Sequence, residues 1–91
     1  MGLNEDFEAA VDSISNKVNK TMSDDELKEI YSLYKQATVG DVNTDRPGML
    51  DFKGKAKWDA WSGKKGISQD DAKQKYVEFA AQMLEKHGAR A

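Results

Sequence analysis

Apolar residues recur along the chain at helical spacing, and this pattern predicts helices and no strands. The first stripe follows the steps i, i+3, i+4, i+7 and i+11, which predicts an amphipathic helix over about residues 4–18. Its members are Phe7, Ala10, Val11, Ile14 and Val18. A similar stripe near the other end predicts a helix that continues to about residue 86. Its members are Ala72, Tyr76, Phe79, Ala80 and Met83. Both stripes are first of all candidates for the core.

Capping residues mark where the helices begin and end. Ser23 is followed three residues later by Glu26, the pattern of a capping box, so a second helix begins there and continues to about residue 39, where Gly40 ends it. Ser68 stands in the same relation to Asp71 and caps the last helix. A short third helix is expected over about residues 52–61, weakened by an internal glycine. The chain is therefore predicted to be an all-α domain of four helices.

A connection of about twelve residues, GDVNTDRPGMLD at 40–51, separates the second helix from the third. This length is unusual in a compact helical domain and indicates a loop that crosses the fold or serves function. Asp41, Asn43 and Asp45 stand at positions 1, 3 and 5 of an apparent calcium loop. However, Arg46 replaces the turn glycine at position 6 and Phe52 replaces the glutamate at position 12. We expect these polar side chains to fasten the loop rather than to bind calcium.

Composition limits the possible functions. Ninety-one residues make one domain, 1–91, and the absence of cysteine excludes disulfides and thiolate metal sites. A net charge of −2 argues against bulk attraction to nucleic acid or to anionic membranes, so an anion would have to be bound by a local lysine cluster. No apolar run approaches the roughly 20 residues of a membrane span. We expect a cytoplasmic monomer without stable membrane insertion.

The second helix has an apolar face that is wider than one packing contact requires. Leu27, Tyr31 and Tyr34 lie round the helix from its main apolar stripe and could line a second surface, with Lys35 at its polar edge. Lys53 and Lys57 are one helical turn apart, so with Lys35 they could neutralise phosphate. The alternative is a broad core face bordered by solvated lysines, and no single lysine distinguishes the two.

Catalysis finds little support in the sequence. The only histidine, His87, falls in the last turn of a helix, where interaction with the helix C-terminus explains it better than a role as a base. The carboxylates lie mostly on polar faces and in first turns. We expect a binding protein and not an enzyme, with no metal or other cofactor.

Three segments of the chain carry a specific pattern: YKQATVGD at 34–41, RPG at 46–48 and DFKGKAKWDAW at 51–61. They resemble the acyl-CoA-binding protein family, also known as diazepam-binding inhibitor. The resemblance extends over essentially the whole chain in length and helix placement. It implies a four-helix bundle with up-down-down-up topology that binds long-chain fatty acyl-CoA esters and serves as an intracellular carrier and pool former.

The resemblance also implies a ligand site, made of Tyr31, Tyr34, Lys35, Lys53, Lys57 and Tyr76. The counterparts of Tyr31, Lys35 and Lys57 meet the adenosine 3′-phosphate in the family, the ring of Tyr34 lies against adenine, and Tyr76 helps to close the site. The apolar positions implied near the acyl chain are Phe7, Val11 and Leu27. Family members often have a lysine in the first helix, and here Ser15 or the nearby Lys17 stands in its place. The alternative function is a small helical protein-interaction module without a lipid ligand.

Overall fold

The computed structural model describes residues 2–18 and 21–87. These described residues form four α-helices: α1 (Leu3–Ser13), α2 (Asp24–Thr38), α3 (Phe52–Ser62) and α4 (Gln69–Lys86). A π-helical turn, η1 (Ile14–Val18), follows α1 directly. Within these ranges no strand occurs, and no helix is both long and apolar enough to cross a membrane.

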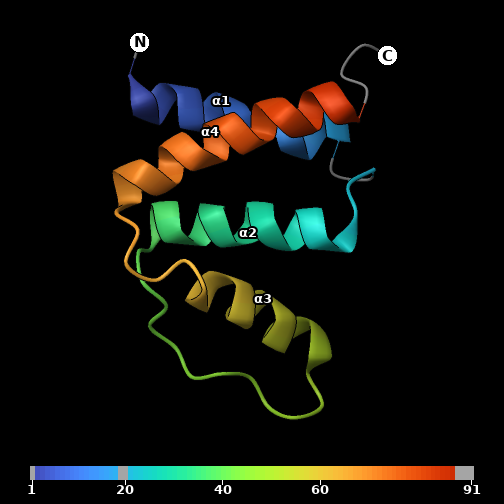
Figure 1. Ribbon diagram of the computed structural model, residues 1–91, viewed down its shortest axis with the longest axis vertical. Coiled ribbons are helices and arrows are strands. Elements are labelled where there is room, and N and C mark those ends of the chain that lie inside the picture. Colours follow the sequence, from blue (N-terminus) through green and yellow to red (C-terminus); the bar gives the residue numbers. More distant parts are fainter. Residues whose placement is uncertain (1, 19–20, 88–91) are drawn as a thin grey trace.

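The helices run up, down, down and up along the chain, as predicted (Figure 1). The central helix is α2, with α4 against one side and α3 against the other, and α1 packs on α4. Because α3 contacts α2 but neither α1 nor α4, the molecule is flat, with extents of 40 × 28 × 15 Å. This arrangement leaves part of the α2 surface open between α1 and α3.

Capping interactions explain where three of the helices begin. The Ser23 hydroxyl accepts a hydrogen bond from the Glu26 amide at 3.2 Å, and the Glu26 carboxylate accepts one from the Ser23 amide at 2.9 Å. Ser68 caps α4 through the amide of Asp71. Asp51 caps α3 by accepting from the Gly54 amide at 2.9 Å. A side chain at position 54 would collide with this carboxylate, so the glycine inside α3 makes room for the cap.

The first helix predicted over residues 4–18 is an α-helix only to Ser13, and its last five residues are π-helical. Regular α-helix ends at Ser13 and the chain widens into the turn η1, although Ile14 remains buried at 5% exposure. A π turn closes i to i+5 hydrogen bonds and still returns apolar residues to one side. Apolar spacing therefore could not distinguish it from α-helix over so few residues. The predicted core position of Val18 lies outside the described side chains.

The core forms where α1, α2 and α4 meet. Three alanines, Ala37, Ala72 and Ala80, are at most 1% exposed and allow close packing of the helices. Larger side chains fill the remaining space. They are Phe7, Ile14, Met22, Ile30, Leu33, Tyr76 and Met83. The stripe predicted for the last helix is confirmed, with Phe79 partly buried at its edge.

The loop over residues 40–51 is fastened to α3 by two indoles and one ion pair. Trp61 donates from Nε1 to the Gly40 carbonyl at 2.8 Å, and Trp58 donates to the Thr44 carbonyl at 2.9 Å. Arg46 binds both carboxylate oxygens of Asp59, each at 2.9 Å. The loop is therefore held along its length.

Asp41 confirms the expectation that a polar side chain fastens this loop. Its Oδ1 accepts from the amide of Gly66 at 2.9 Å and from Nε2 of the buried Gln36 at 2.8 Å. The Gly66 hydrogen bond, followed by that of Gln36, lowers the pKa of Asp41. Asn43 and Asp45 make no such bond within the described chain.

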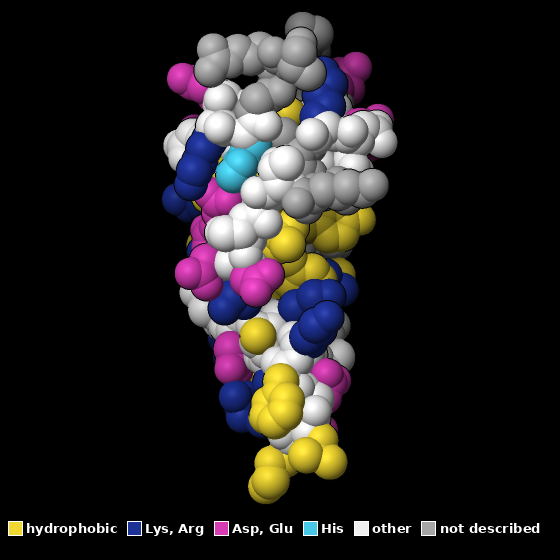
Figure 2. Space-filling view, turned by 90° about the vertical axis from the view of Figure 1, so that its right-hand side faces the viewer, with side chains coloured by type: hydrophobic (Ala, Val, Ile, Leu, Met, Phe, Trp, Pro, Cys, Tyr) yellow, Lys and Arg dark blue, Asp and Glu magenta, His cyan; other side chains and the backbone are white. Residues whose placement is uncertain are grey.

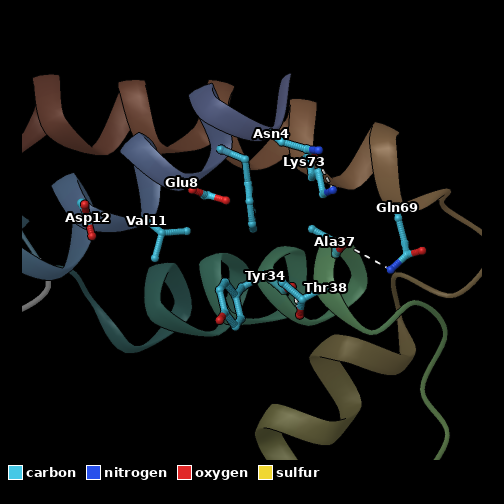
Figure 3. Close-up of a pocket in the computed structure, with 10 residues that line it drawn as sticks. Asn4, Glu8, Val11, Asp12, Tyr34, Ala37, Thr38, Gln69 and Lys73 are labelled. Atoms are coloured by element: carbon cyan, nitrogen blue, oxygen red, sulfur yellow. Dashed lines mark hydrogen bonds between the residues drawn. The ribbon is translucent and has the colours of Figure 1, made fainter. Parts of the chain in front are cut away.

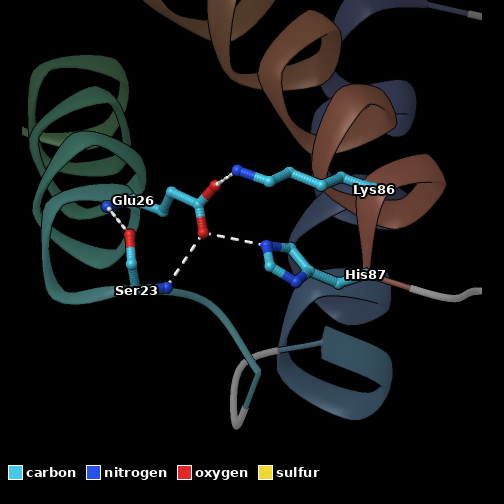
Figure 4. Close-up of polar contacts among 4 residues, drawn as sticks. All are labelled: Ser23, Glu26, Lys86 and His87. Atoms are coloured by element: carbon cyan, nitrogen blue, oxygen red, sulfur yellow. Dashed lines mark hydrogen bonds and ion pairs between the residues drawn. The ribbon is translucent and has the colours of Figure 1, made fainter.

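A polar cluster joins the start of α2 to the end of α4 (Figure 4). Glu26 accepts from Lys86 Nζ at 2.6 Å and meets His87 Nε2 at 2.8 Å, with its side chain only 13% exposed. The Lys86 hydrogen bond, the Ser23 amide and then His87 lower the pKa of Glu26 to about 2. His87 stands at the C-terminal end of α4, as the sequence indicates, and its ring also contacts a carboxylate 61 residues away in sequence, which was not predicted.

Candidate functional site

One stripe of side chains runs along the open face of α2. Leu27, Tyr31, Tyr34 and Thr38 follow one another at intervals of three or four residues, which places them in line on a helix. One end of this stripe borders a groove between α1 and α2, and the other end borders a groove between α2 and α3. Tyr31 stands one turn from both Leu27 and Tyr34, so it lies between the two grooves, and it lines neither of them.

The α1–α2 groove has a volume of about 600 Å³ and an aromatic floor with a polar rim (Figure 3). Phe7, Val11 and Tyr34 supply apolar surface, and Thr38 continues the α2 side. The rim consists of Asn4, Glu8, Asp12, Gln69 and Lys73. Two hydrogen bonds brace its open end. Lys73 Nζ donates to Asn4 Oδ1 at 2.7 Å, and Gln69 donates to the Ala37 carbonyl at 3.3 Å.

Three aromatic rings meet beneath the groove. The Phe7 ring stacks on Tyr34 with centroids 6.0 Å apart and meets the edge of Tyr76 at 5.0 Å. Tyr34 and Tyr76 are 6.4 Å apart. Phe7 and Tyr76 are buried, whereas Tyr34 is 40% exposed and can offer a ring face to a ligand. Burial, with a smaller contribution from Tyr34, raises the pKa of Tyr76 to about 12, so its hydroxyl stays protonated at neutral pH.

The α2–α3 groove has a volume of about 400 Å³ and is more apolar. Leu27, Phe52 and Ala56 form its apolar surface, and Lys53 and Lys57 border it from α3. The remaining lining residues, Asp24 and Lys28, lie in the first two turns of α2. An unbranched apolar chain flanked by cations would suit this groove.

Two lysines lie over aromatic rings between α2 and α3. Lys35 Nζ is 4.9 Å from the centroid of Trp61, and Lys57 Nζ is 5.3 Å from that of Tyr31. Within the described chain, no carboxylate lies within 4.0 Å of either ammonium group, although Lys28, Arg46, Lys64 and Lys86 each pair with one. Ring faces orient a cation without neutralising it, so both ammonium groups remain available to an anion.

Comparison with known proteins identifies the fold and the family. The model of the family described as acyl CoA binding protein matches residues 4–80. The chain belongs to the acyl CoA binding protein family. A protein from Hypsibius that carries an acyl-CoA-binding protein name is 51% identical over 88 residues, which cover 97% of this chain and 98% of that protein.

Solved structures of the acyl CoA binding protein family agree with the fold. The crystal structure of Oryza sativa Acyl-CoA-Binding Protein 2 superposes with a TM-score of 0.90 at 39% identity and covers 99% of both chains. The crystal structure of ACBP from Moniliophthora perniciosa gives 0.85 at 44% identity, with 99% of this chain and 87% of that chain covered. The fold predicted from the resemblance is therefore confirmed.

The nine residues expected in an acyl CoA binding family site do not all lie together. Phe7, Val11 and Tyr34 line the α1–α2 groove, with Tyr76 buried beneath it. Leu27, Lys53 and Lys57 line the α2–α3 groove instead. Tyr31 lies between the grooves, beneath Lys57, and Lys35 lies over Trp61.

Sequence reasoning missed the cation at the α1–α2 groove. Ser15 and Lys17, weighed as replacements for a first-helix lysine, are exposed on η1 and line neither groove. The lysine that does line the groove is Lys73, which comes from α4. Its spacing within α4 gave no signal, because only the packing of α1 on α4 brings it beside Asn4.

Proposed function

We propose that this protein binds long-chain fatty acyl-CoA esters and acts as a cytoplasmic, monomeric carrier and pool former for them. The observation that supports the proposal is the succession of a polar, aromatic groove and a more apolar groove along α2, with Tyr31 one helical turn from each. An acyl-CoA has the same division, with a nucleotide at one end and a hydrocarbon chain at the other.

The head group would occupy the aromatic end of this surface. The exposed ring of Tyr34 is a stacking platform for adenine, and the rim of the α1–α2 groove offers hydrogen-bonding groups. Lys35 and Lys57, with the Tyr31 hydroxyl between the grooves, would bind the 3′-phosphate. Each hydrogen bond to a charged group contributes about 1.5–3 kcal/mol before ordering costs.

The acyl chain would lie in the α2–α3 groove against Leu27 and Ala56, with Lys53 at its border. Burial of a methylene contributes about 0.8 kcal/mol, so burial of half a long chain adds roughly 5 kcal/mol to the affinity of the head group. The resemblance implied that Phe7 and Val11 lie near the acyl chain. The polar rim of their groove favours a role under the nucleotide instead.

A carrier is favoured over an enzyme by the chemistry of the two linings. The only histidine of the sequence, His87, contacts Glu26 and lines neither groove. The other candidate bases in the two linings are the carboxylates of Glu8, Asp12 and Asp24, and all three are exposed to solvent. General base catalysis of thioester hydrolysis would need a base held against the ligand. We therefore propose that the bound thioester is left intact.

Titration calorimetry with CoA, a medium-chain acyl-CoA and a long-chain acyl-CoA tests the proposal. Affinity should rise with chain length, and the thioester should be recovered unchanged after incubation. An absence of binding would favour the protein-interaction module, and loss of thioester would indicate an enzyme. Affinity that is independent of chain length would refute the carrier.

A matched pair of variants distinguishes the contribution of the acyl chain to the affinity from that of the CoA head group. Ala56→Asp places a charge in the α2–α3 groove, so it should abolish the gain from a longer chain while CoA affinity is retained. Ala81→Asp makes the same substitution at an exposed position of α4 and should change neither.

A further inference from the structure

Three large apolar side chains are exposed where the long loop enters α3. Met49 is 81% exposed, Leu50 is 87% exposed and Phe52 is 71% exposed. Figure 2 shows hydrophobic side chains gathered at this extremity of the molecule, with lysine or arginine side chains behind them. Single exposed apolar residues are ordinary, but three within four positions indicate an interaction surface. We call these three residues the apolar tip.

The apolar tip has a defined shape. The Asp51 amide donates to the Gly48 carbonyl at 3.0 Å, which closes a turn with Met49 and Leu50 at its centre. Lys55 Nζ donates to the Met49 carbonyl at 3.0 Å and lies 5.2 Å from the centroid of Phe52. The side chains are thus presented on a braced turn, so little backbone freedom is lost when they contact a partner.

Lysine side chains flank the apolar tip on the α3 side, with Asp24 across the α2–α3 groove. Lys53, Lys55 and Lys57 follow it on α3, and within the described chain none of them has a carboxylate within 4.0 Å. The single acid of this segment, Asp51, is engaged in capping α3. In an anionic bilayer, negatively charged headgroups cover the hydrocarbon. Apolar side chains at the tip can contact the hydrocarbon while the lysines behind them contact the headgroups.

We propose that the apolar tip docks reversibly on the surface of an anionic lipid bilayer. A second copy of the chain is a poor partner, because a symmetric contact through the tip would bring the two lysine clusters together. The tip also projects from the molecule, whereas a small ligand requires a concave site. Since no described helix can span a bilayer, contact is limited to the interface.

Phe52 connects the apolar tip to the proposed ligand site, because it also lines the α2–α3 groove. Docking would therefore hold the open side of that groove against the membrane surface, from which an acyl-CoA would enter the groove. This consequence for acyl-CoA loading rests on the proposed function. The docking itself does not, and it can be tested without any acyl-CoA.

Because the chain has no cysteine, one dye can be placed at one chosen site. Leu50→Cys carries an environment-sensitive dye, and Val39→Cys is the matched control at another exposed apolar position, 43% exposed. Vesicles contain phosphatidylcholine alone or with about one-third phosphatidylserine. We expect a blue shift from the dye at position 50, only with the anionic vesicles and weaker at high salt, and no shift from position 39.

Sedimentation with the same anionic vesicles provides the second readout. Met49→Ser/Leu50→Ser should weaken association about tenfold or more, which corresponds to about 1.4 kcal/mol. Val39→Ser should leave association unchanged. Circular dichroism checks folding, and calorimetry with a long-chain acyl-CoA should give the same affinity for the double variant as for the unmodified chain.

Three outcomes would overturn the proposal. If the unmodified chain does not bind anionic vesicles, the apolar tip does not dock on a bilayer, and a protein partner becomes the better interpretation. Equal binding of the double variant would show that another surface makes the contact. Loss of acyl-CoA affinity in that variant would assign the tip to the ligand site. Failure of the proposed function gives a different result, namely vesicle binding without acyl-CoA binding.

Discussion

Lys35→Met removes one charge from the proposed phosphate site and keeps most of the side chain's bulk. The Lys35 ammonium lies over Trp61, a buried ring whose Nε1 is anchored to the Gly40 carbonyl. The substitution should therefore leave the packing of the stem on Trp61 in place. Loss of the cation–π contact should cost about 1–2 kcal/mol of folding free energy, because Trp61 is buried and Lys35 is half-buried.

The expected effect on binding is larger. If Lys35 makes one charge-assisted hydrogen bond to phosphate, its loss costs about 1.5–3 kcal/mol, which is roughly a 10- to 150-fold weaker affinity for acyl-CoA. CoA alone should lose the same factor, because the contact involves only the head group. The gain from a longer acyl chain should persist.

Titration calorimetry at two salt concentrations measures the affinity of the variant for CoA and for acyl-CoA. Lys75→Met is the matched control. Lys75 is exposed and lines a separate groove with Glu29 and Phe79, so the control makes the same change in net charge away from the site. Equal affinities of the Lys35 and Lys75 variants would refute the role assigned to Lys35. A Lys35→Met variant that loses helicity would instead show a structural role.

The remaining predictions concern stability and pH. Because the pKa of Glu26 is about 2 in the folded chain and 4.5 ordinarily, its contribution is present above pH 4.5 and lost as the pH falls toward 2. Glu26→Gln should flatten that part of a plot of Tm against pH, and an unchanged plot would contradict this. Burial raises the pKa of Tyr76 from 10.0 to about 12, so stability should fall as the pH rises through that window. Tyr76→Phe should remove this alkaline loss in urea unfolding, and a loss that persists would assign it to other groups. Gly54→Ala should change stability little, because loss of the Asp51 cap costs about 1 kcal/mol and the replacement of a helical glycine by alanine gains about as much. In a chain that already carries Asp51→Ala, the same change should stabilise α3. If a double-mutant cycle finds no coupling between the two positions, a side chain at position 54 does not collide with the Asp51 carboxylate.

Local signals predicted the helix boundaries well where the interaction was itself local. Ser23 and Ser68 each cap a helix through an amide three residues away, and Gly40, with φ of +98°, ends α2 as expected. The change to a π turn at Ile14 was not predicted, because its apolar spacing also fits an α-helix. The pairing of His87 with Glu26 depends on how α4 packs beside α2, which no local pattern specifies.

The candidate site could be predicted only in part, and for the same reason. Tyr31, Tyr34 and Lys35 lie within two turns of one helix, so spacing alone placed them near one another. Lys73 joins their surroundings from α4 through tertiary packing, and the chain offered no local signal for it. The separation of Phe7 from Leu27 into two grooves likewise depends on the positions of α1 and α3 on either side of α2.

Two-dimensional NMR of the isotope-labelled chain, titrated first with CoA and then with a long-chain acyl-CoA, tests the central claim most directly. We predict that CoA shifts the amide signals of Val11, Tyr34 and Lys73, and that the acyl chain extends the shifts to Leu27 and Ala56. Identical shifts with both ligands, or shifts confined to the groove lined by Lys64 and Phe79, would contradict the account.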